Sequence, residues 1–296
     1  MTTDPRDRAF NNERKRQLKL YSVEMRSALK EVVQILKSGR QRIVAELALG
    51  ASEFQAWQLP NIQQSIDKVL KEIGDEMASS GSEHLTAAHT LGVDLIEKPL
   101  AAGGLRIAGI LPEVDRRQLM AIRSFLTDRL KNVSAEVANK VKGQIGLVMI
   151  GGQTSADAAT SVAMLIESER SRAVTIVRTE MGRAFSVASQ ERQKQAVEML
   201  PGLKKQWRRS AKVHSRTSHD LADGQIVEVD KPFIVGGVEL MYPRDPNAPA
   251  KETINCGCVS LPHMEHWEVK NAERMPFSDD EIYRNPRKRD LARELN

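Results

Sequence analysis

The sequence has few cysteines and few aromatic residues, and both shortages narrow the class of protein. Its 296 residues include two cysteines, and aromatic residues make up 4%. Two cysteines cannot build the set of disulfide bonds that stabilises small secreted scaffolds, so that class is excluded. The first ten residues are mostly polar, with no apolar segment behind them, which is not the pattern of a signal peptide. We therefore expect a soluble protein kept in a reducing compartment.

Long hydrophobic runs are also missing. The longest apolar stretch, residues 145–150, is far too short to span a bilayer, so we expect no membrane partner. Hydrophobic residues at 41% and charged residues at 28% are typical of a folded chain rather than a disordered one. The length is enough for one large domain or two ordinary domains with hydrophobic cores.

Positive charge is present in modest excess and is unevenly distributed. The formal net charge is +5, and residues 116–203 alone carry 13 basic and 8 acidic side chains, a net of +5. A basic balance of this size permits a polyanionic partner such as nucleic acid without identifying one.

The first two thirds of the chain show the spacing of long helices. Between Leu18 and Leu36 the apolar residues recur every three or four positions, as on one face of a helix. Residues 154–157 (Thr-Ser-Ala-Asp) form a capping-box pattern that predicts the start of a helix. Further helices are predicted over residues 61–77, 82–95, about 113–142 and about 171–197, where Pro201 and Gly202 follow.

The last third has a different periodicity. Short β-branched runs at residues 226–229, 233–235 and 238–241 predict strands, and Gly236-Gly237 is a hairpin turn between the last two. Three prolines between residues 243 and 249 predict an irregular loop. We therefore predict an α+β fold, with a predominantly helical N-terminal two thirds and a small C-terminal part rich in β-hairpin and loops.

Glu180 falls on the apolar face of its predicted helix. A helical wheel places it in one stripe with Val177, Met181, Ala184 and Phe185. A carboxylate on a buried face is costly unless it is paired, so Glu180 requires a cationic or donor partner from elsewhere in the chain. Two interpretations follow: an active-site carboxylate, or a structural ion pair that joins the helical and β parts, which we favour.

A basic run follows the last long helix. Residues 204–216 contain six cations, one tryptophan and no acid, and clustered cations beside an aromatic residue are typical of phosphate binding. The alternative is a solvated basic face with Trp207 filling the core. The candidate DNA-binding residues are Lys204, Lys205, Arg208, Arg209, Lys212 and Arg216.

Metal-ligand residue types gather near the C-terminus. Two imidazoles and two thiolates, from His214, His219, Cys256 and Cys258, would complete a tetrahedral zinc site. One residue between the cysteines is fewer than in known zinc modules, and a disulfide between them would close a small strained ring. The alternative is a pair of packed thiols with surface histidines. No sequence motif frames a serine as an acyl-transfer nucleophile.

An ordered set of motifs then resembles a known family. Arg-Thr-Glu at 178–180 is followed by a tryptophan, Arg-x-x-His, Asp-Gly, a β-hairpin, Tyr-Pro-x-Asp-Pro and Asn-Cys-Gly-Cys. This order resembles the phage Mu F-like head-morphogenesis family, the minor head proteins of tailed phages. The resemblance covers about residues 115–262, between a helical region at 1–114 and a charged tail at 263–296. The motif residues are Arg178, Glu180, Trp207, Arg216, His219, Gly224, Pro243, Asn255, Cys256 and Cys258.

The resemblance implies a structural role in a virus particle. It implies a minor capsid protein of a tailed phage or prophage, assembled in the host cytoplasm and placed in the capsid interior at the portal vertex. The implied partners are the portal protein, a scaffold or major capsid protein, and packaged double-stranded DNA bound without sequence specificity. The implied roles are head morphogenesis, DNA packaging and genome delivery, with residues 1–114 docking on the portal or scaffold.

The same resemblance leaves an enzymatic alternative open. We expect no catalytic residue and no cofactor other than a structural zinc. The alternative is an ADP-ribosyltransferase-like enzyme using Glu180, or a metal-dependent hydrolase using His219 and the cysteines. Two departures weaken a shared catalytic role: Gly257 replaces the arginine usual between the cysteines, and Lys212 stands near a position where an aspartate is frequent.

Overall fold

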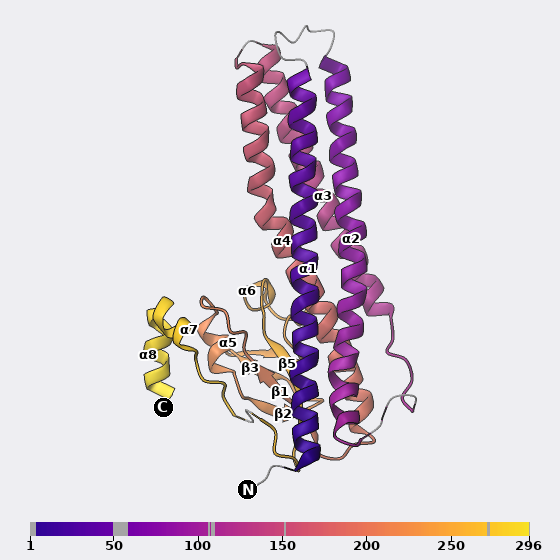
Figure 1. The fold of residues 1–296 in the computed structure, drawn as a ribbon, viewed down its shortest axis with the longest axis vertical. Helices are drawn as coiled ribbons and strands as arrows, with labels where there is room; N and C mark the ends of the chain where they lie inside the picture. The colour runs from indigo at the N-terminus through magenta and orange to yellow at the C-terminus, as the bar shows by residue number, and fades with distance from the viewer. Residues whose placement is uncertain are drawn as a thin grey trace. The chain divides into compact units, whose positions relative to one another are not determined.

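Four long helices and a set of short strands make up the fold. The computed structural model describes residues 4–49, 59–105, 107, 110–150, 152–270 and 273–295. The long helices are α1 (Pro5–Leu49), α2 (Leu59–Ala102), α3 (Arg117–Met149) and α4 (Ser155–Val197) (Figure 1). The shorter elements are β1 (Leu203–Arg208), α5 (Thr217–Leu221), β2 (Ile226–Glu228), β3 (Phe233–Val235), β4 (Val238–Leu240), α6 (Ala250–Thr253), β5 (Val259–Met264), α7 (Asp279–Arg284) and α8 (Pro286–Leu295). The predicted α+β class is confirmed.

The helices are longer than the sequence pattern predicts. The helices predicted at 61–77 and 82–95 form one continuous α2, because the small residues between them pack instead of breaking the helix. A Cβ atom on Gly81 would lie 3.1 Å from side-chain atoms of Leu126 and Leu130 of α3. Likewise α3 does not end near residue 142 but continues to Met149 through Gly143, where a methyl group would meet open space.

Helix α4 begins where the capping box predicts. The backbone N–H of Asp157 donates to Oγ1 of Thr154 at 3.1 Å, and the Asp157 carboxylate accepts from the Thr154 hydroxyl at 2.7 Å. The helix then runs unbroken to Val197, so the separate helix predicted from residue 171 is its continuation. Ion pairs between residues three apart, such as Arg170 with Glu167, support the polar stretch between the two apolar halves.

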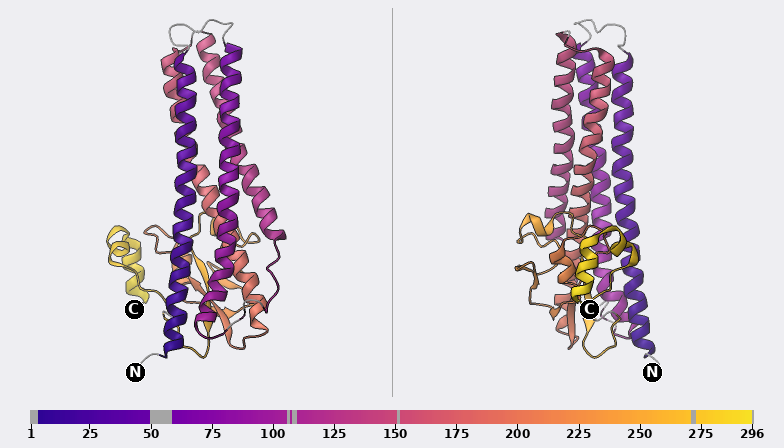
Figure 2. Two further views of the ribbon diagram at one scale, coloured as in Figure 1. Left: turned by 45° about the vertical axis from the view of Figure 1, so that its right-hand side comes forward. Right: turned by 90° about the vertical axis from the view of Figure 1, so that its left-hand side faces the viewer.

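The chain divides into two compact units, each assembled from separated segments. One unit contains Glu24–Leu85 and Met120–Glu180, which are parts of the four long helices, shown side by side in Figure 2. Its buried residues are aliphatic, in agreement with the scarcity of aromatic residues here, and include Val32, Leu36, Ile43, Leu70, Ile73, Leu126, Leu130, Val137 and Val177. On its surface Lys131 pairs with Asp75, and Lys142 with Asp67.

The other unit contains Met1–Val23, Thr86–Leu119 and Met181–Asn296, and it holds all the strands of the described chain. Strand β1 lies between β2 and β5 in an antiparallel sheet, and β3 and β4 form a separate hairpin. The predicted hairpin turn is confirmed: Gly236 and Gly237 both have positive φ, of 60° and 76°, which glycine adopts at little cost.

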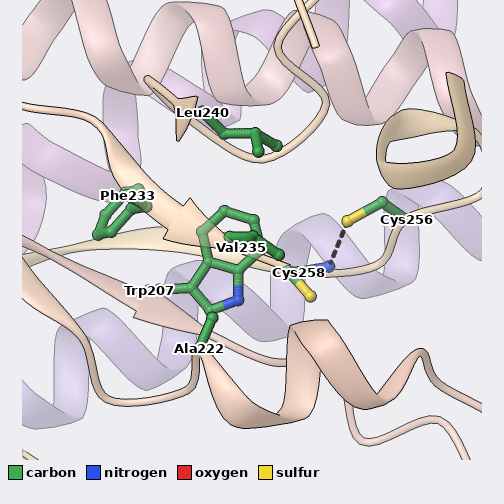
Figure 3. Packing of buried hydrophobic residues seen from close by; sticks show 7 residues of the cluster. All are labelled: Trp207, Ala222, Phe233, Val235, Leu240, Cys256 and Cys258. Carbon is green, nitrogen blue, oxygen red and sulfur yellow. Dashed lines mark hydrogen bonds between the residues drawn. The ribbon is translucent and has the colours of Figure 1, made fainter. Parts of the chain in front are cut away.

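Aromatic residues form the core beside this sheet. Trp207 of β1 is fully buried, and its ring lies edge-on to that of Phe233 with centroids 5.3 Å apart. The surrounding buried cluster is Trp207, Ala222, Phe233, Val235, Leu240, Cys256 and Cys258 (Figure 3). The interpretation of Trp207 as a core residue is therefore confirmed.

Residues 263–296 are folded where the structure describes them, although their composition suggested only a charged tail. Strand β5 extends to Met264, and α7 and α8 follow. Helix α7 begins with a capping box in which Ser278 and Glu281 exchange hydrogen bonds. The division of the chain at residues 114 and 262 stays a prediction.

The crossing of α2 and α4 generates a test of packing. A Cβ atom on Gly92 would lie 2.3 Å from the backbone oxygen of Phe185 and 2.9 Å from Cβ of Ala188. We expect Gly92→Ala to lower the free energy of unfolding by about 1–3 kcal/mol through overpacking. The matched control Gly143→Ala, on an open helix surface, should raise it by about 0.5–1 kcal/mol. Thermal unfolding followed by circular dichroism measures both, and equal midpoints for the two variants would contradict the tight crossing.

Candidate functional site

One histidine and two cysteines meet in the core of the strand-containing unit. His219 lies on α5, and Cys256 and Cys258 lie between α6 and β5. Nδ1 of His219 is 3.4 Å from Sγ of Cys258 and 3.5 Å from Sγ of Cys256. All three side chains are buried, with 2% or less of their surface exposed. The structure therefore brings together three of the four predicted metal-ligand residues.

A carboxylate orients the histidine from its other side. Nε2 of His219 lies 2.9 Å from Oε2 of Glu252 on α6, and the Ser218 hydroxyl donates to the same oxygen at 3.3 Å. A carboxylate only accepts, so in the neutral ring Nε2 carries the proton and donates it. The lone pair of Nδ1 then points at the two sulfur atoms. Glu252 was missed by the sequence analysis, since no motif singles it out.

The two cysteines shift each other's ionisation in opposite directions. A hydrogen bond from Cys258 lowers the pKa of Cys256 well below its ordinary value, whereas burial raises the pKa of Cys258 well above it. The backbone N–H of Cys258 also donates to Sγ of Cys256 at 3.4 Å (Figure 3). Cys256 is therefore the more acidic of the two thiols, and Cys258 is the less acidic.

Arg244 holds the cysteine loop against α4. Its guanidinium donates to the backbone oxygen of Cys256 at 2.8 Å and to the hydroxyl of Ser186 at 2.7 Å. The residue is 1% exposed and has a φ of 70°, a left-handed conformation that costs energy outside glycine. It occupies the variable position of Tyr-Pro-x-Asp-Pro, which is why motif analysis passed over it. Asn255, with a φ of 57°, makes the corresponding turn at the cysteines.

The two departures from the family pattern are neighbours in space. A Cβ atom on Gly257 would lie 2.8 Å from Cβ of Ser210 and 3.1 Å from Cε of Lys212. Nζ of Lys212 donates to the backbone oxygen of Asn255 at 2.7 Å. In this chain a lysine from the preceding segment therefore stands beside the position where an arginine is usual.

The fourth predicted ligand lies at the edge of the site. His214 is exposed and is not in the cluster of three ligand atoms, but it lines a cavity of about 90 Å³ that reaches His219 and both cysteines. The arrangement permits two kinds of chemistry. One is metal binding by an imidazole and two thiolates, and the other is thiol chemistry assisted by a histidine and a carboxylate.

The basic run is not a solvent-facing surface, which corrects the prediction for half of its cations. Residues 203–208 form the central strand β1, which the sequence analysis missed, and Lys205, Arg208 and Arg209 are buried. Nζ of Lys205 donates to Oε1 of Gln190 at 3.3 Å and to the backbone oxygen of Met241 at 2.7 Å. These cations satisfy acceptors inside the protein, so phosphate groups cannot reach them in this fold.

Buried carboxylates complete this network. Nη1 of Arg208 lies 3.0 Å from Oδ2 of Asp223, whose Oδ1 also accepts the backbone N–H of Arg209 at 2.8 Å. The Arg209 guanidinium pairs with Glu281 of α7 and lies 4.3 Å above the ring of Phe277. Burial opposes ionisation of Glu281, but its hydrogen bonds from Arg209 and others lower its pKa to about 2.

The other three cations of the run lie nearer the surface and also have partners. Lys204 pairs with Glu228 and Glu265, at 3.2 and 3.0 Å. Nη2 of Arg216 donates to the backbone oxygen of Ile254 at 2.7 Å. Together with the bond from Lys212, this contact fixes the chain just before the cysteines.

The remaining motif residues shape the backbone or pair within the helices. The amide of Gly224, with a φ of 84°, donates to the backbone oxygen of Trp207 at 3.0 Å. Pro243 is buried in the loop between β4 and α6.

Arg178 and Glu180 lie on α4 in the other unit, and Oε1 of the fully buried Glu180 is 3.9 Å from Nη1 of Arg129 on α3. That ion pair is with a helical residue, and a partner of Glu180 from the β part stays a prediction.

The comparisons with known proteins agree with the motif order. Residues 139–261 match the family described as "Phage Mu protein F like protein". The NAD(+)--arginine ADP-ribosyltransferase EFV of Enterococcus faecalis is 32% identical over 136 residues, which are 46% of this chain and 28% of that protein. The uncharacterized protein YqbB of Bacillus subtilis is 33% identical over 115 residues, which are 38% of this chain and 37% of that protein. No solved structure matches the chain.

Residues 139–261 therefore resemble a domain of the phage Mu F-like family. The matched segment begins within α3, later than the predicted residue 115, and ends inside β5. The chain spans only about a third of the length of the two relatives, so their printed names describe more than this segment. Among the described residues, no helix is both long enough and apolar enough to cross a membrane.

The buried lysine of β1 generates a test with a definite sign. Burial lowers the pKa of Lys205 from 10.5 to about 8. Between these two values the unfolded chain binds more protons than the folded one, so this group makes the fold more stable as pH rises from about 8 to about 10.5. Wild type should therefore gain thermal stability relative to Lys205→Met across that window. A difference between the two proteins that stays constant with pH would contradict a charged, buried Lys205.

Proposed function

We propose that this protein is a minor head protein of a tailed phage or prophage, which acts in head morphogenesis at the portal vertex of the virion. The observation that carries the proposal is the family match over residues 139–261, which spans the helix α4, the central strand and the cysteine loop. Its partners would be the portal protein and a scaffold or major capsid protein. The family residues in the strand-containing unit support the role, since most of them hold loops and strands in place.

The proposed role is structural rather than catalytic. The transferase alternative depended on Glu180, whose carboxylate is fully buried and lies near Arg129, where no substrate reaches it. The transferase named from Enterococcus shares 28% of its length with this chain, so its activity is not carried over. The hydrolase alternative needs room for a substrate beside the metal or nucleophile, and the cavity that reaches His219 and both cysteines is only about 90 Å³.

Particle composition tests the role. We expect purified virions to contain the protein in far fewer copies than the major capsid protein, measured by quantitative mass spectrometry of gradient-purified particles. Deletion of the gene should give defective heads by electron microscopy, and expression of the wild-type protein in trans should restore them. Normal, infectious heads without the protein would contradict the proposal.

We propose that DNA contacts the exposed cations of α8 and the neighbouring Arg216. These residues replace the buried cations of β1 as candidates. A cavity of about 480 Å³ is lined by Arg216 of the basic run and by Arg287 of α8. Lys288 also lines it but is buried and paired with Glu281 and Asp220, so it is not one of the proposed phosphate-binding cations. Arg287 and Arg289 are exposed. Cations grouped in this way bind phosphates without reading sequence, and packaged DNA would supply them.

Salt dependence tests the DNA contact. Each phosphate contact contributes about 0.9 to the slope of log affinity against log salt concentration, so Arg287→Gln with Arg289→Gln should lower that slope by about 2. The control pair Lys68→Gln with Arg123→Gln changes two exposed cations of the other unit and should leave the slope unchanged. Equal slopes for the two double variants, or no DNA affinity of wild type at low salt, would exclude this surface.

A further inference from the structure

We propose that His219, Cys256 and Cys258 bind one zinc ion, with Glu252 positioning the histidine. Nothing in the family match or in the names of the relatives assigns a metal to this protein. The proposal rests on the geometry of the buried cluster and is independent of the role in the phage head.

The distances between the ligand atoms fit a zinc ion. Zn–N bonds of about 2.0–2.1 Å and Zn–S bonds of about 2.3 Å in tetrahedral geometry place the nitrogen and sulfur atoms about 3.6 Å apart. The two measured distances from Nδ1 of His219 are 3.4 Å to Cys258 and 3.5 Å to Cys256. All three ligand atoms lie within 4.8 Å of one another. A single ion therefore fits between them without rearrangement of the backbone.

The carboxylate partner of His219 is of the kind that commonly accompanies metal-binding histidines. An imidazole that binds metal through one nitrogen commonly donates its other N–H to a carboxylate, which fixes the ring and makes it a better ligand. Here Nε2 of His219 contacts Glu252 at 2.9 Å while Nδ1 faces the sulfur atoms. Glu252 is itself buried and receives a hydrogen bond from Ser218, so its orientation is fixed.

The chemistry of the ligands selects zinc. Thiolates and imidazole are soft and borderline ligands that favour zinc over magnesium or calcium, which prefer oxygen. The loop already stabilises negative charge at sulfur, because the N–H of Cys258 donates to Sγ of Cys256 and the Arg244 guanidinium binds the backbone oxygen of Cys256. The fourth position of the ion would face the cavity of about 90 Å³ and would be filled by water.

A nucleophilic cysteine is the competing interpretation of the same side chains. The histidine and carboxylate would then activate one sulfur atom, as in cysteine hydrolases. Two observations favour the metal instead. The histidine nitrogen lies nearly equally far from both sulfur atoms, whereas a nucleophile needs only one. Both sulfur atoms are buried, which leaves no access for a substrate carbonyl group.

Metal content and cobalt substitution of the full-length wild-type protein test the proposal directly. Protein purified under reducing conditions without chelators should retain about one zinc ion per chain. Replacement of zinc by Co²⁺ should give the sulfur-to-cobalt charge-transfer and d–d absorption bands of tetrahedral cobalt with thiolate ligands. A reduced, folded protein that binds neither ion would overturn the proposal.

Variants then assign the ligands. Cys256→Ser, Cys258→Ser and His219→Ala should each lose the zinc, while the control His214→Ala, which changes another histidine of the same cavity, should keep it. Circular dichroism establishes which variants fold, and the cobalt spectrum of wild type does not depend on them. Loss of zinc from His214→Ala, or full zinc content in a folded Cys258→Ser variant, would overturn this set of three ligands.

The role of Glu252 has its own measurement. Glu252→Gln keeps the size of the side chain but replaces the carboxylate, so zinc affinity in competition with a chelator should fall about 10- to 100-fold. The cobalt spectrum should keep its thiolate bands, because the three ligands remain. Unchanged affinity in this variant would overturn the positioning role.

Discussion

The strand-containing unit depends on hydrogen-bond and ion-pair partners for the buried cations of its central strand. Lys205, Arg208 and the adjoining Arg209 are buried, and an unpaired buried charge costs several kcal/mol, of the order that unfolds a small domain. Each cation is therefore matched by acceptors from a different part of the chain: Gln190 on α4, Asp223 after α5, and Glu281 on α7. Formation of the sheet thus requires these three segments to be in place at once.

This requirement explains why the charged C-terminal segment is folded. Glu281 is the partner of Arg209, and Lys288 of α8 contacts the same carboxylate, so both helices are attached to the network through ion pairs. The same network reaches the candidate metal site, because Asp223 follows α5, the helix that carries His219. Replacing one of these charges would take away one partner of the buried groups that it contacts; Glu281, for example, would keep only one of its two cations.

The sequence predicts those elements whose local pattern agrees with their environment. The long helices, the capping box of α4 and the glycine hairpin follow from periodicity and turn chemistry, which act over a few residues. Strand β1 is not predicted, because its sequence does not alternate between apolar and polar residues. The strand is buried on both faces, so both faces carry residues of the interior. The partners of its buried cations lie far away in the sequence. The residue types of the candidate metal site could be listed from the sequence, but Glu252 and Arg244 could not, since only the fold shows their contacts with His219 and Cys256.

The loop that carries the cysteines is held mainly by backbone geometry, at motif positions and at two others, Arg244 and Lys212. Asn255 and Arg244 adopt left-handed conformations, Gly224 does so with a hydrogen bond to Trp207, and Arg216 and Lys212 donate to the carbonyl groups before the cysteines. The left-handed conformations cost conformational energy, and the hydrogen bonds offset this cost by holding the loop in place. This loop presents Cys256 and Cys258 to His219. A substrate site would leave these sulfur atoms open to solvent. Their burial, with the imidazole oriented by a carboxylate, is compatible with the single metal ion that we propose.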